Sequence, residues 1–397
     1  MPDSVKKYRP SRNVTLLGLT SFFNDFSSEM VLSIFPAFFT SVLKAGAGSL
    51  GLVEGFADGA ANIIKIYAGR LSDATQKRKP FMVVGYALSV VTRPVYLLTA
   101  SVGGVLGLRF ADRVGKGLRE APRDAIISLS TPKEEIGRAF GYHRMLDTLG
   151  ALGGPLVAYL ILRANPNAFD TVFIVAFIIG LLALASLVFV KDTVGDLKKN
   201  GITLASIAVF PADFKRYLIA LFLLAMGSMP VAVLLLSTQH IGLAIASIPL
   251  FYMLYNLSFV GFSLRAGGLS DQIGPRKVLR IGYLVLLVGY TVIVFAKSTP
   301  ALILGFLVLG LFPALTDGVA RALAAELSPP EYRAGAYGLV NATMGFGLMV
   351  AGVGGGYLWE RFSAPTALVV AGMCVVVGVL LLSTIITNGK REAQNSP

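Results

Sequence analysis

Long apolar stretches, separated by short polar segments, follow one another along the whole chain. A helix that crosses the hydrocarbon core of a bilayer needs about 20 mostly apolar residues. Twelve stretches reach this length, near residues 14–41, 49–68, 81–100, 103–128, 140–162, 168–190, 217–239, 246–264, 278–296, 300–325, 335–358 and 365–387. The pattern predicts an all-α integral membrane protein with twelve transmembrane helices.

Composition supports a lipid environment over an aqueous one. Of 397 residues, 55% are hydrophobic and 14% are charged, and the mean hydropathy is +0.71. Soluble domains contain about 25% charged residues. A soluble fold is therefore excluded for most of this chain.

The distribution of lysine and arginine predicts the orientation in the membrane, because short cytoplasmic loops retain positive charge. One set of loops and tails holds Lys6, Lys7, Arg9, Arg12, Lys77, Arg78, Lys79, Lys133, Arg138, Lys198, Lys199, Lys215, Arg216, Arg276, Lys277, Arg333, Lys390 and Arg391. The opposite loops hold Lys44, Arg163, Lys297 and Arg361. We therefore expect a multi-pass protein of the bacterial cytoplasmic (inner) membrane with both termini cytoplasmic. Topology accounts for the net charge of +13, and we expect no nucleic-acid partner.

An internal repeat divides the chain into two halves. The segment 68–73 (AGRLSD) recurs at 266–271 (AGGLSD), 198 residues later, and a basic pair follows each copy. The same offset relates Arg123 to Arg321 at the ends of the fourth and tenth apolar stretches. Parallel repeats of this kind are typical of transporters. We predict two pseudo-symmetric six-helix bundles, an N-terminal lobe over residues 1–190 and a C-terminal lobe over 217–397, joined by a cytoplasmic linker over 191–216.

The repeated Gly-x-x-x-Asp loop with trailing basic residues resembles the signature of the major facilitator superfamily, and the resemblance covers the whole chain. It implies that a charge network latches the lobes on the cytoplasmic side as they rock between alternating-access states. We assign this gating role to Gly69, Asp73, Arg78, Arg123, Gly267, Asp271, Arg276 and Arg321.

Two further patterns resemble those of particular branches of this family. The segment 109–117 (RFADRVGKG) is similar to an arginine and glycine motif that the family associates with proton coupling, and 150–155 (GALGGP) is similar to a pattern of its antiporters. The runs 112–119 and 121–124 resemble a bacterial branch of drug or siderophore exporters. The resemblance implies a monomer that binds a small-molecule substrate and protons, with the proton gradient as energy source and no cofactor.

Charged residues inside the apolar stretches indicate a hydrated pathway, because a charge near the bilayer centre costs roughly 2.5–3.5 kcal/mol. Asp25 and Glu29 are four residues apart and share one helix face, and Glu54 and Asp58 repeat this spacing in the second stretch. The fourth stretch supplies countercharges. We predict proton coupling by Asp25, Glu29, Asp58 and Arg109.

The same cleft is the predicted substrate site. The second lobe has fewer charges and adds aromatic residues, so we expect it to form an apolar wall for an amphipathic solute. The predicted substrate-binding residues are Asn24, Asp25, Glu29, Glu54, Asp58, Arg109, Arg113, Asp147, Tyr252, Tyr255, Asn256, Asp317 and Asn341.

The function that follows is proton-coupled antiport that exports a small amphipathic organic compound, of a drug-like or siderophore-like kind. The basic residues leave open transport of an organic anion or phosphorylated solute, and the acids leave open export of a divalent metal. A non-transporting sensor or scaffold is the alternative from another class. The two histidines, His143 and His240, belong to no catalytic or metal motif, so we do not expect an enzyme or a resident metal.

Overall fold

The computed structural model describes residues 9–75, 77–132, 135–192, 207–329 and 332–385. Within these ranges the side chains of residues 65, 66, 68–74, 208, 240, 264 and 334 are not described. All regular secondary structure in the described ranges is helical.

Helices run through both halves of the chain in the predicted order. Those of the first half are α1 (Arg12–Ser41), α2 (Ala47–Thr75), α3 (Lys79–Val95), η1 (Tyr96–Leu98), α4 (Val102–Leu129), α5 (Ile136–Ala164) and α6 (Phe169–Val188). Those of the second half are η3 (Ile207–Val209), α7 (Ala212–Met226), α8 (Val231–Leu235), α9 (Ser237–His240), η4 (Ile245–Ser247), α10 (Ile248–Ile273), α11 (Pro275–Phe295), α12 (Thr299–Leu327), α13 (Arg333–Arg361) and α14 (Ala364–Ser383).

The twelve apolar stretches coincide with α1 to α6, with α7, α8 and α9 taken together, and with α10 to α14. In the described residues, nine helical segments are long and apolar enough to cross a membrane. The other three, α1, α2 and α4, contain 28 to 30 residues but include the intramembrane charges that lower their hydropathy. The predicted all-α membrane fold is confirmed, and its most polar helices belong to the first half.

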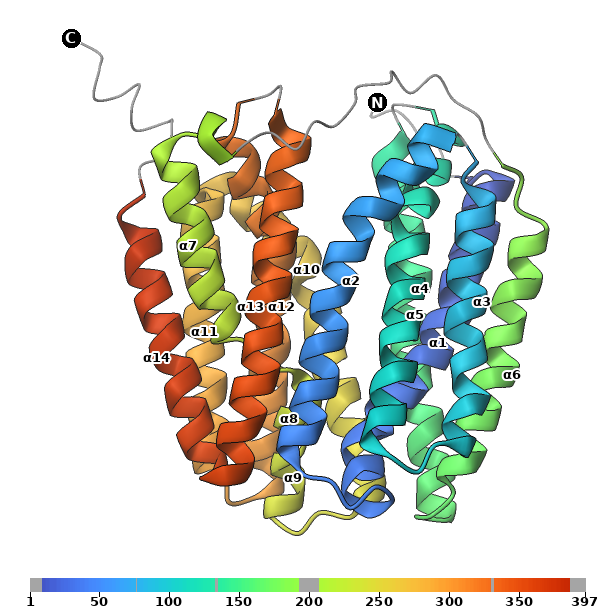
Figure 1. Ribbon diagram of the computed structural model, residues 1–397, viewed down its shortest axis with the longest axis vertical. Helices are drawn as coiled ribbons and strands as arrows, with labels where there is room; N and C mark the ends of the chain where they lie inside the picture. The colour runs from blue at the N-terminus through green and yellow to red at the C-terminus, as the bar shows by residue number, and fades with distance from the viewer. Residues whose placement is uncertain (1–8, 76, 133–134, 193–206, 330–331, 386–397) are drawn as a thin grey trace, which may run out of the picture.

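The two halves stand side by side, and both termini lie at the same end of the molecule (Figure 1). In the first half α1 packs on α5 and α6, and α4 packs on α2 and α3; in the second, α12 packs on α10 and α11, and α7 on α13 and α14. The halves meet where α2 contacts α13 and α5 contacts α10. The last five residues of the predicted linker, 212–216, are helical, because Asp213 in the first turn of α7 favours a helix start there.

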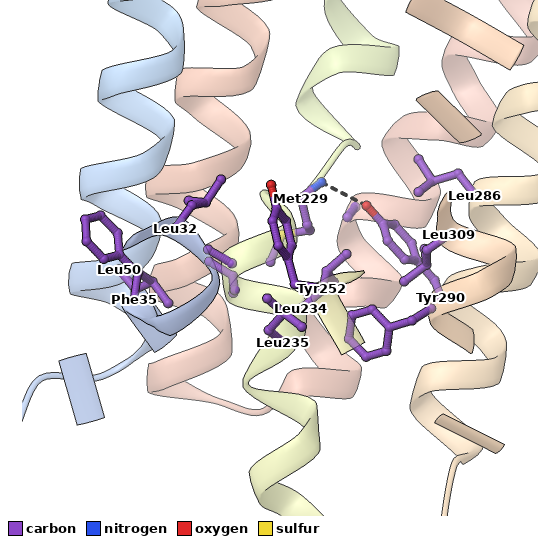
Figure 2. Close-up of a cluster of buried hydrophobic side chains, with 14 of the residues drawn as sticks. Leu32, Phe35, Leu50, Met229, Leu234, Leu235, Tyr252, Leu286, Tyr290 and Leu309 are labelled. Atoms are coloured by element: carbon purple, nitrogen blue, oxygen red, sulfur yellow. Dashed lines mark hydrogen bonds between the residues drawn. The ribbon is translucent and has the colours of Figure 1, made fainter. Parts of the chain in front are cut away.

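A continuous cluster of buried apolar side chains joins the halves at the end away from the termini. Leu32 and Phe35 of α1 and Leu50 of α2 belong to the same cluster as Leu234 of α8 and Tyr252 of α10 (Figure 2). The cluster therefore closes the space between the halves at this end.

The seventh span is interrupted between α7 and α8, at residues 227–230. A broken helix leaves backbone groups without helical partners, and these are costly inside a membrane. The hydroxyl of Tyr290 on α11 satisfies two of them: it accepts a hydrogen bond from the Met229 N–H at 2.8 Å and donates one to the Gly227 carbonyl at 2.8 Å. Figure 2 shows the first of these bonds.

We expect Tyr290→Phe to destabilise the second half by about 1–3 kcal/mol, because two buried backbone groups lose their partner while the ring still fills its space. The midpoint of unfolding in detergent micelles measures the effect. Tyr357→Phe, at a tyrosine that is 59% exposed, is the matched control and should leave the midpoint unchanged. Equal midpoints for both variants would show that the bridge contributes nothing.

Candidate functional site

A cavity of about 870 Å³ lies between the two halves. Its lining residues come from α2, α4 and α5 on one side and from α10, α12 and α13 on the other. They lie in the parts of these helices that face the end with both termini, from Arg113 to Asp124 in α4 and from Phe259 to Asp271 in α10. The apolar cluster closes the opposite end, so access to the cavity is from one side.

The wall of the cavity formed by the first half is a row of ion pairs. The Arg113 Nε lies 3.1 Å from the Asp58 Oδ1, and one turn further along α4 the Lys116 Nζ lies 3.9 Å from the Glu120 Oε1. Near the open end Arg123 pairs with Asp124 at 3.0 Å. Mutual neutralisation of this kind makes a charged wall tolerable at membrane depth.

The wall formed by the second half combines apolar side chains with two acids. Phe259, Met344 and Leu348 are among its apolar lining residues. Asp317 of α12 and Asp271 of α10 are both exposed to the cavity. This wall is therefore partly apolar and partly polar, and Phe259 lines the cavity, whereas Tyr252 and Tyr255 do not.

Four of the predicted substrate-binding residues line the cavity, namely Asp58, Arg113, Asp317 and Asn341. Of the predicted gating residues, Arg123, Gly267, Asp271 and Arg321 line it as well. The other predicted substrate residues lie outside the lining in this conformation and fall into three groups.

The first group is a buried charge network inside the first half. Arg109 holds Glu54 through two parallel hydrogen bonds of 2.8 and 2.7 Å and also contacts Asp112 at 3.1 Å. Arg93 of α3 pairs with Asp112 at 2.9 Å and donates a hydrogen bond to Ser28 of α1 at 2.6 Å. The side chains in these ion pairs are no more than 7% exposed, and two acids balance two bases.

The network joins α1, α2, α3 and α4. Its charges are already compensated, and Glu54 and Arg109 pair with each other and do not line the cavity in this conformation, so their predicted substrate contact stays a prediction. The predicted part of Arg109 in proton coupling stays a prediction. Arg93 was not among the predicted site residues, because its partners, Asp112 and Ser28, come from other helices.

The second group lies between α1 and α5. The carboxyl groups of Asp25 and Asp147 face each other within side-chain hydrogen-bonding range. The Asn24 amide donates to the Asp25 Oδ1 at 3.0 Å, and the Arg144 Nη1 contacts the Asp147 Oδ2 at 3.1 Å. Arg144 is 61% exposed and lines the cavity, so it joins this acid pair to the cavity.

The third group bridges the halves next to the closed end. Tyr252 of α10 faces Glu29 of α1 and lies beside Asn256. The Glu29 Oε2 and the Asn256 Nδ2 are buried and have no hydrogen-bond partner among the described residues. Tyr255 stacks on Tyr252 with ring centroids 6.2 Å apart. These residues offer polar groups to a solute that reaches the floor of the cavity.

Of the other gating residues, Arg78 and Arg276 have contacts near the ends of their own halves. The Arg78 backbone N–H donates to Asp192, at the start of the predicted linker, at 3.2 Å, and the Arg276 guanidinium donates to the Ile385 carbonyl of the second half. The surroundings of Gly69 and the side chain of Asp73 lie outside the described part of the chain. The cytoplasmic latch stays a prediction, and a cavity open at this end is the state in which a latch would be released.

Known proteins resemble the chain over nearly its whole length. Residues 17–229 and 217–397 each match the family model described as Major Facilitator Superfamily. An uncharacterised MFS-type transporter of Methanocaldococcus jannaschii is 36% identical over 379 residues, covering 94% of each chain. A multi-drug resistance efflux pump PmrA homologue of Lactococcus lactis is 24% identical and covers 93% of each chain. Among solved structures, a mutant of the nucleoside transporter NupG has a TM-score of 0.81 at 14% identity and covers 94% of this chain and 99% of its own.

Proposed function

Because this chain belongs to the Major Facilitator Superfamily, as both halves match its family model, we propose that it is a proton-coupled antiporter. It exports a small amphipathic organic compound across the cytoplasmic membrane by alternating access. The one-sided cavity between the halves is the observation on which this proposal rests.

The size of the cavity fits a small organic molecule. Binding sites for such ligands are typically about 300–1,000 Å³, and this one measures about 870 Å³. The positive-inside pattern supports a cytoplasmic position for the termini, and hence for the open end of the cavity. The proposed substrate then enters from the cytoplasm in the conformation described.

The chemistry of the walls favours an amphipathic solute. One wall presents Arg113 and Lys116, and the other presents Phe259, Met344 and Leu348 together with Asp317. An apolar body can lie against α10 and α13 while a polar group contacts α4 or Asp317. A solute and a proton that compete for the same carboxylates produce antiport, because each shifts the conformational equilibrium only through its differential affinity.

Export is supported by the helix-five pattern at 150–155 and by the relative whose name describes a multidrug efflux pump. Because that relative is only 24% identical, it supports the direction of transport and does not identify a particular compound.

Transport of an organic anion is less well supported, because the charged lining residues cancel. Among the described lining residues the acids are Asp58, Glu120, Asp124, Asp271 and Asp317, and the bases are Arg113, Lys116, Arg123, Arg144 and Arg321, five of each sign. An anion site needs an excess of positive charge, and the described part of the lining does not supply one.

Divalent-metal export requires several oxygen ligands around one point. Two of the four candidate acids have basic partners instead, since Glu54 pairs with Arg109 and Asp58 with Arg113. Among the described residues, no group of three or more His, Cys, Asp or Glu side chains is placed to hold a metal ion.

The test is dissipation of an imposed pH gradient in inside-out vesicles. We expect amphipathic compounds to dissipate the gradient only in vesicles that contain the protein, with organic anions and divalent metals without effect. Vesicles that lack the protein set the baseline. Asp170→Asn, at an exposed acid in the first turn of α6, is the control for loss of an acid outside the site.

Two results would contradict the proposal. If a radiolabelled solute crosses without any change in the pH gradient, transport is not coupled to protons. If only anions or only metals dissipate the gradient, the proposed substrate class is wrong.

A further inference from the structure

The interface between α1 and α5 is unusually close, and two glycines make it so. A Cβ at Gly150 would collide with the Phe22 carbonyl oxygen, and one at Gly154 with the Phe26 carbonyl oxygen. Both obstacles are backbone atoms, which cannot move aside as a flexible side chain can. The helices are therefore held together next to the level of Asp25 and Asp147.

Asp25 and Asp147 face each other across this interface, and polar or charged groups of α1, α5 and α4 surround them. From α1 come Asn24, which donates to Asp25 at 3.0 Å, and Glu29, one turn further along. From α5 comes Arg144, which contacts Asp147 at 3.1 Å. From α4, Lys116 and Arg119 act on Asp25 at longer range.

The two bases of α4, Lys116 and Arg119, already have closer partners. The Arg119 Nη1 donates to the Ser89 hydroxyl at 2.5 Å, and Lys116 lies 3.9 Å from Glu120. Among the described basic residues, only Arg144 contacts the pair directly, and it does so at Asp147.

One base in direct contact therefore stands against two carboxyl groups within hydrogen-bonding range of each other, while Lys116, Arg119 and Arg123 of α4 act at longer range. Two carboxylates at this separation cannot both stay ionised in a site of low polarity, and a proton held between them removes the repulsion. Carboxyl pairs of this kind titrate as a unit and not as two independent groups.

We propose that Asp25 and Asp147 hold one shared proton, and that this pair is the proton-binding site of the transport cycle. The inference rests on the proposed proton coupling and deepens it. From the sequence, proton coupling was predicted for Asp25, whereas Asp147 was predicted only as a substrate contact.

A short chain of polar contacts lies one helical turn from the pair, on the side of the cavity. One turn from Asp25 on α1, the Ser21 hydroxyl lies 2.8 Å from the His143 Nε2, and His143 is one turn from Asp147 on α5. The Arg123 Nη1 contacts Ser21 at 3.4 Å, and Arg123 lines the cavity beside Asp124. These polar groups lie between the acid pair and the open end of the cavity.

Infrared spectroscopy of the protein in lipid tests the shared proton without any solute. The carbonyl stretch of a protonated carboxyl group is followed as pH changes, in the unmodified protein and in Asp25→Asn and Asp147→Asn. Among the pH-dependent carboxyl signals, we expect one band that is lost in both variants, because each removes one half of the pair. Asp170→Asn should retain the band, and Asp25→Glu should shift it without loss.

Two independent carboxyl groups would give a different result: each Asn variant would remove one component and leave the other. That outcome would overturn the shared proton. Retention of the band in Asp25→Glu shows that loss in Asp25→Asn does not arise from misfolding.

The link to the transport cycle is tested by the distance between the halves at the closed end. Spin labels at Val42, which is 47% exposed, and Phe362, which is 65% exposed, report this distance once Cys374 is replaced by serine. We expect acidification to change the distance distribution in the unmodified protein and in Asp170→Asn, but not in Asp25→Asn or Asp147→Asn. A response to pH that persists in both Asn variants would show that the pair does not control the cycle.

These results separate failure of this inference from failure of the proposed function. If the vesicle assay shows proton-coupled transport that survives in both Asn variants, the function stands and the acid pair is not its proton site. If the vesicles show no coupling while the shared band is present, the pair exists but the proposed antiport is wrong.

Discussion

Replacing Arg109 by glutamine is expected to destabilise the first half by about 3–5 kcal/mol, because it leaves the Glu54 carboxylate buried without its base. Glu54 is 3% exposed and receives both of its hydrogen bonds of 2.8 and 2.7 Å from Arg109. Asp112 loses one contact but keeps Arg93 at 2.9 Å. Unfolding by sodium dodecyl sulfate in mixed micelles measures the change in free energy.

A second substitution distinguishes lost pairing from lost packing. Glu54→Gln in the Arg109→Gln background removes the uncompensated charge, so the double variant should be more stable than Arg109→Gln alone. Arg163→Gln, at an exposed arginine in the last turn of α5, serves as the control and should have the stability of the unmodified protein. If the double variant is the least stable of the set, the pair does not neutralise a buried charge in the way argued.

Gly352→Leu is expected to hold the closed end of the molecule open and to abolish transport. A Cβ at Gly352 would lie 2.8 Å from the Gly55 backbone nitrogen and would collide with the Gly51 carbonyl oxygen. The contact between α2 and α13 joins the two halves, so the clash falls on the interface that closes this end. Overpacking costs about 1–3 kcal/mol, which shifts an equilibrium between two states by about 5- to 150-fold.

The distance between spin labels at Val42 and Phe362 measures the opening, and the vesicle assay measures the loss of transport. Gly354→Leu is a matched control on the same helix, because a Cβ there meets nothing within 4 Å. Gly354→Leu should therefore retain both the short distance and the activity. A short distance in Gly352→Leu would show that α2 and α13 can repack around the added side chain, and would remove this contact as a requirement for closure.

The sequence predicted those site residues whose type alone indicates that they need a polar environment. A charge inside an apolar stretch must be compensated, and this rule identified Asp58, Arg113 and Asp317, all of which line the cavity. The same rule also selected Glu54 and Arg109, which the structure places in a buried network. Helical spacing defines which face of a helix is polar, but it does not define whether that face meets water or another charged helix.

Contacts between distant segments could not be predicted from the sequence either, because helical spacing does not define which helices pack together. Arg93 reaches Asp112 of the next helix and Ser28 of the first, and Asp147 faces Asp25 across the α1 and α5 interface. Phe259 was missed because one aromatic residue among many apolar ones gives no signal of its own.

The sequence by itself determined that this protein is an all-helical membrane protein with an internal repeat, because hydrocarbon requires long apolar helices and duplicated segments keep their motifs in register. It also determined which charges the membrane must accommodate. Only the tertiary structure decided how those charges are divided among a closed network, an acid pair and the wall of a cavity. The division depends on which helix faces meet, and glycine contacts such as those of Gly150 and Gly352 define how closely they meet.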